Sequence, residues 1–197
     1  MAESATREVR PDGKLRLPPG QRLTEGWPVL HYGSIPRMDT DSWRFHAWGL
    51  VAEERQFTWD EFNALGETTD VSDIHCVTTW SKYDNEWAGV PFRKLYDEIQ
   101  VKPEAKVVMV HSSGGYTTNV PLEDLLAEGV LFARTHNGEP LSNDHGWPIR
   151  LVVPHLYFWK SAKWVGGMQF LDEDRPGFWE MYGYHMYGDP WEEERYG

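Results

Sequence analysis

The chain contains a single cysteine, Cys76, and its neighbours limit the chemistry open to that thiol. A lone thiol can pack in a core, act as a nucleophile or ligate a metal. His75 precedes it directly, and on an extended chain adjacent side chains point to opposite faces, which disfavours zinc held by both. No CxxC pair and no nucleophile motif surrounds Cys76. The residues alone therefore leave a buried cysteine, a Cys/His hydrolase and a metal ligand open.

A second candidate group is basic. Arg150, Lys160 and Lys163, with Ser161 among them, fall within fourteen residues. The chain as a whole has 31 acidic and 19 basic side chains and a formal charge of −12. In that setting the group is either a solvated basic edge or a local cradle for an anion such as phosphate. The overall negative charge disfavours nucleic acid and anionic membrane surfaces as partners.

Short strands and short helices are expected to position these residues. β-Branched and aromatic runs predict strands at 43–51, 70–79, 106–111, 116–120, 130–134 and 149–154. Thr58 and Glu61 form a capping-box pattern for a helix ending near Gly66, and further helices are predicted at 91–100 and 121–127. This interleaving lacks the regular βαβ rhythm of a doubly wound sheet. The sequence therefore predicts a mixed α+β fold.

The length of 197 residues suits one domain whose core can enclose a cofactor. Residues 1–26 are polar and contain prolines and glycines, so we expect an extended N-terminal arm there and the domain at 27–197. The aromatic tail from Pro176 is expected either to pack back as a strap or to be disordered. The first residues show no apolar export segment and no twin arginine, which with the single cysteine predicts a cytoplasmic location.

Taken together, a series of segments resembles the molybdopterin-binding domain of the sulfite oxidase family. The resemblance runs from His31 to Val165 in matching order and spacing, through the segments at 31–37, 43–51, 75–81 (HCVTTWS), 137–141, 144–154 and 160–165 (KSAKWV). It implies a sulfite-oxidase-type fold of mixed sheets with short helices, and a cofactor in which molybdenum is bound to a pyranopterin dithiolene (Mo-molybdopterin).

The same resemblance implies roles for individual residues. Cys76 matches the cysteine whose thiolate ligates molybdenum beside the dithiolene sulfurs, and a soft thiolate suits that metal. The implied contacts to the rest of the cofactor are His31, Tyr32, Gly33, His75, Ser112, Ser113, His145, Arg150, Ser161, Ala162 and Lys163. From position alone, Tyr116 is predicted to be catalytic, and a loop at Trp80 to Trp87 to help form the substrate funnel.

The implied activity is a two-electron oxidation or reduction of a small molecule, typically by oxygen-atom transfer, with electrons exchanged with an external partner protein. Sulfite oxidases place arginines near the metal where this chain has residues 28–30 and 79–82, so the substrate stays open. A non-catalytic molybdopterin carrier or scaffold and a metal-free hydrolase are the alternatives. With no room for the family's heme and dimerisation domains, the chain is expected to be a monomer.

Overall fold

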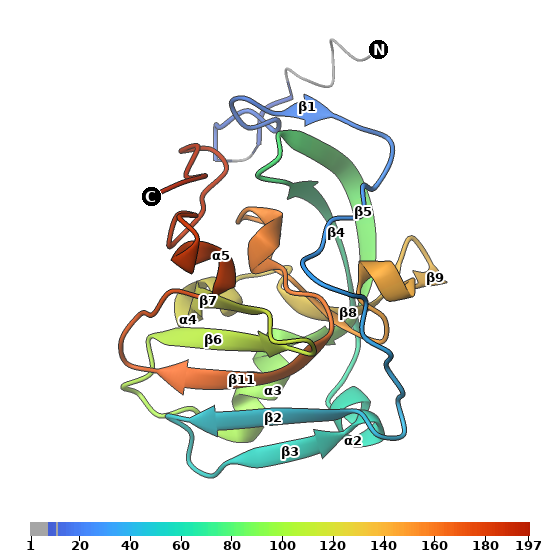
Figure 1. Cartoon of the computed structure of the whole chain (residues 1–197), viewed down its shortest axis with the longest axis vertical. Helices are drawn as coiled ribbons and strands as arrows, with labels where there is room; N and C mark the ends of the chain where they lie inside the picture. Colours follow the sequence, from blue (N-terminus) through green and yellow to red (C-terminus); the bar gives the residue numbers. More distant parts are fainter. Residues whose placement is uncertain (1–7, 11) are drawn as a thin grey trace.

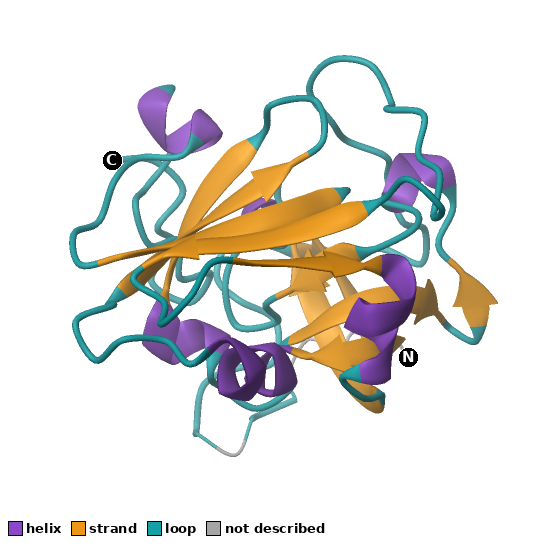
Figure 2. Cartoon of the chain, turned by 90° about the horizontal axis from the view of Figure 1, so that it is seen from below, coloured by secondary structure: helices purple, strands orange, loops and turns teal. Residues whose placement is uncertain are grey.

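The computed structural model describes residues 8–10 and 12–197; the part of the predicted N-terminal arm at 1–7 and 11 lies outside them. Two β-sheets make up the body of the protein, and short helices lie at their margins (Figures 1 and 2). Most strand pairs are antiparallel and helices do not alternate regularly with strands. The predicted α+β class is confirmed.

The first sheet carries most of the segments that surround the site. Its order is β1 (Arg22–Leu23), β5 (Trp80–Pro91), β8 (Leu131–His136) and β10 (Arg150–Val152), with β4 (Thr68–His75) also paired to β5 and β9 (Glu139–Pro140) paired to β8. β1 runs parallel to β5, and the other pairs are antiparallel. The turn between β4 and β5 holds Cys76.

The second sheet is the layer at the bottom of Figure 1. Its order is β3 (Arg55–Thr58), β2 (Arg44–Gly49), β11 (Val165–Leu171), β6 (Val107–Ser112) and β7 (Thr117–Pro121), with β2 and β11 parallel. The α-helices are α2 (Trp59–Ala64), α3 (Phe92–Ile99), α4 (Leu122–Leu125) and α5 (Phe178–Met181), and 3₁₀ turns lie at η1 (Asn143–His145) and η2 (Phe158–Lys160).

Local sequence signals account for the two longer helices. Thr58 caps α2 through its side chain, and the Glu61 carboxylate accepts from the Thr58 backbone N–H at 2.8 Å, so the capping box is present as predicted. In α3 the buried side chains Phe92, Leu95 and Ile99 recur on one face. Both helices turn an apolar face to the core.

The core divides into two clusters. One lies between the sheets and is centred on Phe45, Phe62 and Phe132, whose ring centroids are 4.8 to 5.5 Å apart. The other contains Cys76, Trp80, Trp87, Tyr157 and Trp159 among other buried side chains. The lone cysteine therefore belongs to a small aromatic core of its own, beside the cavity described below.

The segment from Trp80 to Trp87 is a strand, so the prediction of a loop there is wrong. It pairs with β4, with His75 opposite Ser81 at one end of the ladder and Thr68 opposite Gly89 at the other. Two features hid this pairing. Thr79 takes a left-handed backbone conformation with φ +74°, closing the hairpin without the glycine that such a turn normally signals. The ladder also shifts register between Ser72 and Ile74, so side chains do not alternate regularly.

The C-terminal segment packs against the body through a buried ion pair. Lys160 Nζ lies 2.6 Å from Glu180 Oε1, and neither side chain is exposed. Lys160 Nζ also donates to the Asn119 carbonyl at 2.8 Å and the Met186 carbonyl at 2.7 Å. Among the described residues, no helix is both long enough and apolar enough to cross a bilayer.

Candidate active site

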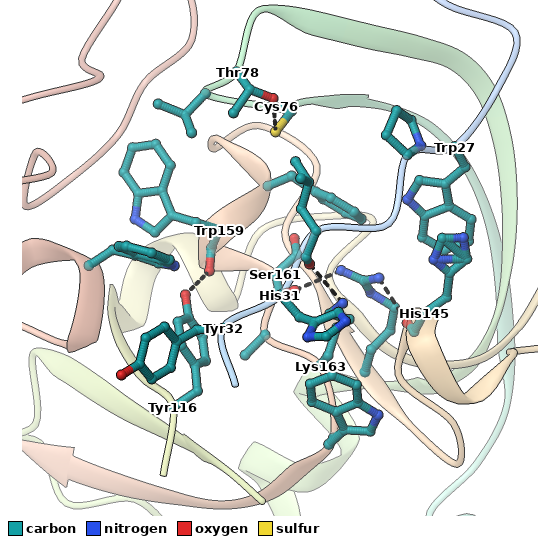
Figure 3. A pocket seen from close by; sticks show the side chains of 18 of the residues that line it. Trp27, His31, Tyr32, Cys76, Thr78, Tyr116, His145, Trp159, Ser161 and Lys163 are labelled. Carbon is teal, nitrogen blue, oxygen red and sulfur yellow. Dashed lines mark hydrogen bonds between the residues drawn. The ribbon is translucent and has the colours of Figure 1, made fainter. Parts of the chain in front are cut away.

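A cavity of about 350 Å³ lies where the β4–β5 turn, the segment from η1 to β11, and the C-terminal segment meet. Figure 3 shows Cys76 and Lys163 approaching it from different sides. We refer to the part around Cys76 as the sulfur end and the part around Arg150, Lys163 and His145 as the basic end.

At the sulfur end, Cys76 is the first residue of the turn after β4. Its Sγ lies 3.1 Å from Thr78 Oγ1, while its backbone N–H donates to the Trp80 carbonyl at 2.8 Å. The side chain is almost entirely buried, and burial raises the pKa of the thiol above its ordinary value. A raised pKa disfavours a free thiolate nucleophile, whereas metal ligation deprotonates the sulfur directly.

Aromatic side chains form the rest of the sulfur end. Trp80 and Trp159 line it, as do Trp179 and Tyr184 from the C-terminal segment. Trp179 and Tyr184 are stacked with ring centroids 5.1 Å apart, and Trp159 meets Tyr184 edge-on at 5.0 Å. The indole N–H of Trp80 is buried and has no hydrogen-bond partner in the protein. This end therefore offers mainly aromatic faces, with the hydroxyl-bearing Thr78 and Tyr184 among its lining residues.

The basic end is built around Arg150, which is buried on β10. Its Nη1 donates to the His145 carbonyl at 2.9 Å and its Nη2 to the Ser161 carbonyl at 2.8 Å, while its Nε has no partner. The guanidinium lies 4.2 Å from the centroid of the Phe158 ring. Within the described part of the chain it makes no salt bridge. Burial lowers its pKa to about 9.

Lys163 and His145 complete the basic end. Lys163 Nζ donates to the carbonyls of Leu30 at 2.8 Å and Asp144 at 2.7 Å. Burial, followed by the nearby Arg150 charge, lowers the pKa of Lys163 to about 7 and that of His145 to about 4. The His145 ring is stacked on Trp27 with centroids 3.8 Å apart. The acceptors of the Arg150 and Lys163 hydrogen bonds here are all backbone carbonyls, which are neutral.

Glycine at position 146 lets these side chains approach one another. Gly146 has φ +114°, and a Cβ there would lie 3.1 Å from Cβ of Arg150 and 3.2 Å from Cβ of Lys163. Any larger residue would push the two cations apart. The backbone is thus shaped to pack the basic side chains closely.

The structure brings most of the predicted site residues together. Those that line the cavity are His31, Tyr32, Cys76, Tyr116, His145, Arg150, Ser161, Ala162 and Lys163. Gly33, His75, Ser112 and Ser113 do not line it. Ser112 and Ser113 lie at the β6–β7 turn, where the Ser113 N–H donates to the Trp164 carbonyl at 2.9 Å.

Two of these predicted residues have polar groups that are bonded within the protein. His75 points away from the cavity: its Nδ1 lies 2.8 Å from Ser81 Oγ, and its ring meets Trp191 edge-on at 5.0 Å. This is the opposite-face arrangement expected of neighbours on a strand. The Tyr116 hydroxyl donates to the Trp159 carbonyl at 2.6 Å, so it holds the wall of the cavity.

Sequence reasoning missed several lining residues. Trp27 and Phe158 at the basic end, and Trp179 and Tyr184 at the sulfur end, were not assigned to a site. The dense aromatic content of the tail was the available signal, because packing back as a strap was one of the two predictions for the tail. It gave no means of choosing the surface on which it packs.

Comparison with known proteins assigns the chain to a family. Residues 32–179 match the family described as the oxidoreductase molybdopterin binding domain. The chain belongs to this family. Its Mo-molybdopterin cofactor and its oxidoreductase class, both predicted through the sulfite oxidase resemblance, are thereby confirmed.

Individual relatives agree with that assignment. The chain is 48% identical over 182 residues to the oxidoreductase YuiH of Bacillus subtilis, covering 92% of each protein. It is 27% identical over 173 residues to a putative protein-methionine-sulfoxide reductase subunit of Azospira oryzae, covering 86% of this chain and 66% of that protein. The solved structure of the sulfane dehydrogenase SoxCD from Paracoccus pantotrophus matches with a TM-score of 0.66 and 25% identity, covering 73% of this chain and 41% of that one.

The cavity residues fit molybdopterin chemically. The buried Arg150 has a free Nε and no carboxylate partner among the described residues, and such a cation is costly unless an anion is bound. A phosphate group would supply that anion and is well matched to a guanidinium. Cys76 places the chain's only thiol in the same cavity. A soft sulfur and a phosphate-binding cation are the two contacts such a cofactor needs.

Proposed function

We propose that the Cys76 thiolate is the protein ligand of molybdenum and that Arg150, with Lys163 and His145, holds the phosphate end of the pterin. One observation supports this most strongly: the only sulfur able to ligate as a thiolate and the buried cation without a carboxylate line the same cavity. When bound, molybdenum would supply two-electron chemistry, typically the transfer of an oxygen atom. The chain's own residues orient the cofactor and shield the sulfur from water.

A Cys/His hydrolase is a weaker interpretation of the same residues. The atom beside Cys76 Sγ is Thr78 Oγ1. The neighbouring His75 bonds to Ser81 instead. No imidazole of the described residues is hydrogen-bonded to the thiol, so a base that would activate it as a nucleophile is missing.

We further propose that the substrate is uncharged. The sulfur end is lined by Val77, Thr78, Trp80, Trp159, Trp179 and Tyr184, none of which carries a positive charge. The nearby Arg195 guanidinium is bonded to the Val77 carbonyl and does not line the cavity. An oxyanion such as sulfite or nitrate requires cations, whereas an organic sulfoxide needs an apolar surface and one donor. The relative named as a methionine-sulfoxide reductase subunit is in keeping with that class.

Lys82 is the basic residue that follows Cys76 most closely in sequence, and it does not change this conclusion. Its Nζ donates to Asn85 Oδ1 at 2.7 Å, and it does not line the cavity. Because its ammonium group is bonded within β5 and lies outside the cavity, it does not hold an anionic substrate.

An external redox partner follows from the balance of electrons. Transfer of one oxygen atom moves two electrons, which must be returned before the next turnover. We therefore propose that a separate protein exchanges these electrons. The cytoplasmic location and the monomeric state stay predictions.

The test combines metal analysis with a redox assay. Protein from a host that makes molybdopterin is analysed for molybdenum and for the fluorescence of released pterin. The loaded protein is then reduced, and its optical spectrum is followed on addition of dimethyl sulfoxide or nitrate; the oxidised protein is treated separately with sulfite. We expect reoxidation by the sulfoxide, loss of the response in Cys76→Ser, and an unchanged response in Thr69→Ser, a matched change at an exposed position of β4.

Two outcomes would count against the proposal. Full loading with molybdenum and pterin but no redox response to a broad substrate panel would favour the carrier or scaffold. Protein without molybdenum from a competent host would contradict the metal site itself.

A further inference from the structure

The turn that carries Cys76 is held from outside by both ends of the chain. Gln21 Nε2 donates to the Cys76 carbonyl at 3.0 Å, and the Arg22 N–H to the Thr79 carbonyl at 2.9 Å. From the other end, Arg195 Nη1 donates to the Val77 carbonyl at 2.8 Å. Carbonyls of a four-residue turn are thus bonded by segments about 55 and 118 residues away in sequence.

The turn has little to hold it from within. Its internal backbone bonds are those from the Cys76 N–H to Trp80 and from the Thr79 N–H to Cys76. Thr79 has φ +74°, a region that β-branched residues rarely occupy, so its conformation must be imposed by surrounding contacts. Contacts from the two chain ends are the ones in place to impose it.

The two ends also brace each other. Arg195 Nη2 lies 3.3 Å from the Pro19 carbonyl, and the Trp191 indole donates to the Leu15 carbonyl at 2.7 Å. Lys14 Nζ forms a salt bridge of 3.0 Å with Glu192. In Figure 1 the blue N-terminal and red C-terminal segments lie at the same end of the molecule, next to β1 and the upper end of β5.

Arg195 is placed to act as more than a surface residue. Its side chain is only 14% exposed, and its guanidinium lies 5.0 Å from the centroid of the Tyr157 ring. Tyr157 belongs to the same buried cluster as Cys76. A guanidinium held over an aromatic ring and bonded to the Val77 carbonyl restrains the backbone next to the sulfur.

From these contacts we infer that Arg195, assisted by Gln21, is a positioning residue for the Cys76 sulfur, and that residues 14–22 and 191–195 form one clamp on the ligand turn. This rests on the proposed ligation of molybdenum by Cys76. The clamp sets the direction from which the sulfur meets the metal. It touches neither cofactor nor substrate.

The first test uses the metal-free protein and measures amide hydrogen exchange over residues 76–80. Arg195→Met keeps the length of the side chain but removes its donors. We expect exchange there about tenfold faster than in the wild type, because opening of the turn becomes easier. Arg195→Lys, which can still donate to Val77, should recover part of the protection. Arg175→Met, a matched change at an exposed arginine, should leave exchange unchanged.

The second test uses the loaded protein and reads the metal directly. In Arg195→Met we expect a shifted electron paramagnetic resonance signal of the molybdenum and a shifted sulfur-to-molybdenum absorption band, with both returning towards the wild type in Arg195→Lys. If Arg195→Met does not fold, Gln21→Leu removes one bond from the opposite end and should shift both readouts less, in the same direction.

A purely structural role for Arg195 predicts something different. It would lower the melting temperature and speed exchange throughout the chain, with no excess at 76–80 and no change in the metal spectrum, and that result would overturn the clamp. The outcome is separable from the ligand proposal. If Cys76→Ser keeps the wild-type spectrum, the ligand assignment fails; if Cys76→Ser alters it and Arg195→Met and Gln21→Leu do not, only the clamp fails.

Discussion

The two ends of the cavity differ in their charge and in the side chains that line them. At the basic end, positive charge is buried among backbone carbonyls and aromatic rings, with a free donor on Arg150 and no carboxylate partner in the described chain. At the sulfur end, Cys76 is neutral before metal binds and is surrounded by aromatic side chains. The basic end has the character of an anion-binding site, and the sulfur end that of a metal-ligand site with apolar surroundings.

This contrast teaches how binding and reactivity can be divided within one cavity. A buried unpaired cation costs stability, and an anion offsets that cost, so the basic end contributes affinity. The sulfur end contributes one covalent contact and an apolar environment, which govern the chemistry of the metal more than the retention of the cofactor. Mutations at the two ends should therefore separate loading from reactivity.

The largest effect is expected at the buried Lys160–Glu180 ion pair, which joins the C-terminal segment to the rest of the protein beside the sulfur end. Lys160→Met leaves the Glu180 carboxylate buried without its partner, so the free energy of unfolding should fall by about 3–5 kcal/mol. Chemical denaturation of the metal-free protein measures this. The double variant Lys160→Met with Glu180→Leu should be more stable than the single one, and a double variant that is no better would contradict the ion-pair explanation.

A second prediction separates loading from stability at the basic end. In Arg150→Met the pterin should be retained about 100-fold less tightly, because charge-assisted hydrogen bonds to phosphate are lost. The metal-free protein should be at least as stable as the wild type, since an uncompensated buried charge is removed. Pterin fluorescence and denaturation measure the two effects, with Arg175→Met as control. Full pterin retention combined with reduced stability would show that Arg150 is structural.

The pH dependence of anion binding gives a third prediction. Because the pKa of Lys163 is about 7, its charge is lost as pH rises through that value. Sulfate, whose charge stays constant, should bind the metal-free protein progressively more weakly above pH 7, by up to about tenfold per pH unit. Calorimetric titration measures the affinity.

The control for this prediction is Lys163→Met, in which binding should be weaker and independent of pH near 7. A wild-type affinity that does not change between pH 6 and 8 would contradict the assignment. The stability of the metal-free chain has the opposite dependence: since the unfolded lysine keeps its proton above pH 7, stability should rise with pH from about 7 upwards.

The smallest effect is expected at the sulfur end. Thr78→Val keeps the shape of the side chain but removes the hydroxyl 3.1 Å from Cys76 Sγ. Molybdenum and pterin contents should stay the same, while the midpoint potential of the metal shifts by the equivalent of about 1 kcal/mol or less. Spectroscopic redox titration measures it. Loss of cofactor in this variant would mean that the sulfur end also governs loading.

The same contrast explains what could be predicted from sequence. Much of the basic end comes from one short stretch, so spacing along the chain grouped Arg150, Ser161 and Lys163. The same spacing also grouped Lys160 with them, which is wrong, because Lys160 is buried against Glu180 and does not line the cavity. Cys76 was conspicuous because it is the only cysteine. The α+β class and the capped helix after Thr58 also followed from local patterns. These are signals carried by neighbours in sequence.

The remaining features depend on contacts between distant segments. The strand at Trp80–Pro91 depends on a left-handed Thr79 and an irregular ladder, neither of which has a sequence signature. The positions of Trp179 and Tyr184 depend on where the tail packs. The role of Arg195 depends on its contact with Val77, 118 residues away in sequence. Periodicity and spacing report local geometry, so they could not reveal these.

The most direct test of the account is the number of sulfur atoms bound to molybdenum, measured by X-ray absorption at the metal edge in the wild type and in Cys76→Ser. If Cys76 ligates molybdenum, the variant has one sulfur fewer around any molybdenum that it retains, and the pterin is still held through Arg150. An identical sulfur count in the two proteins would contradict ligation by Cys76.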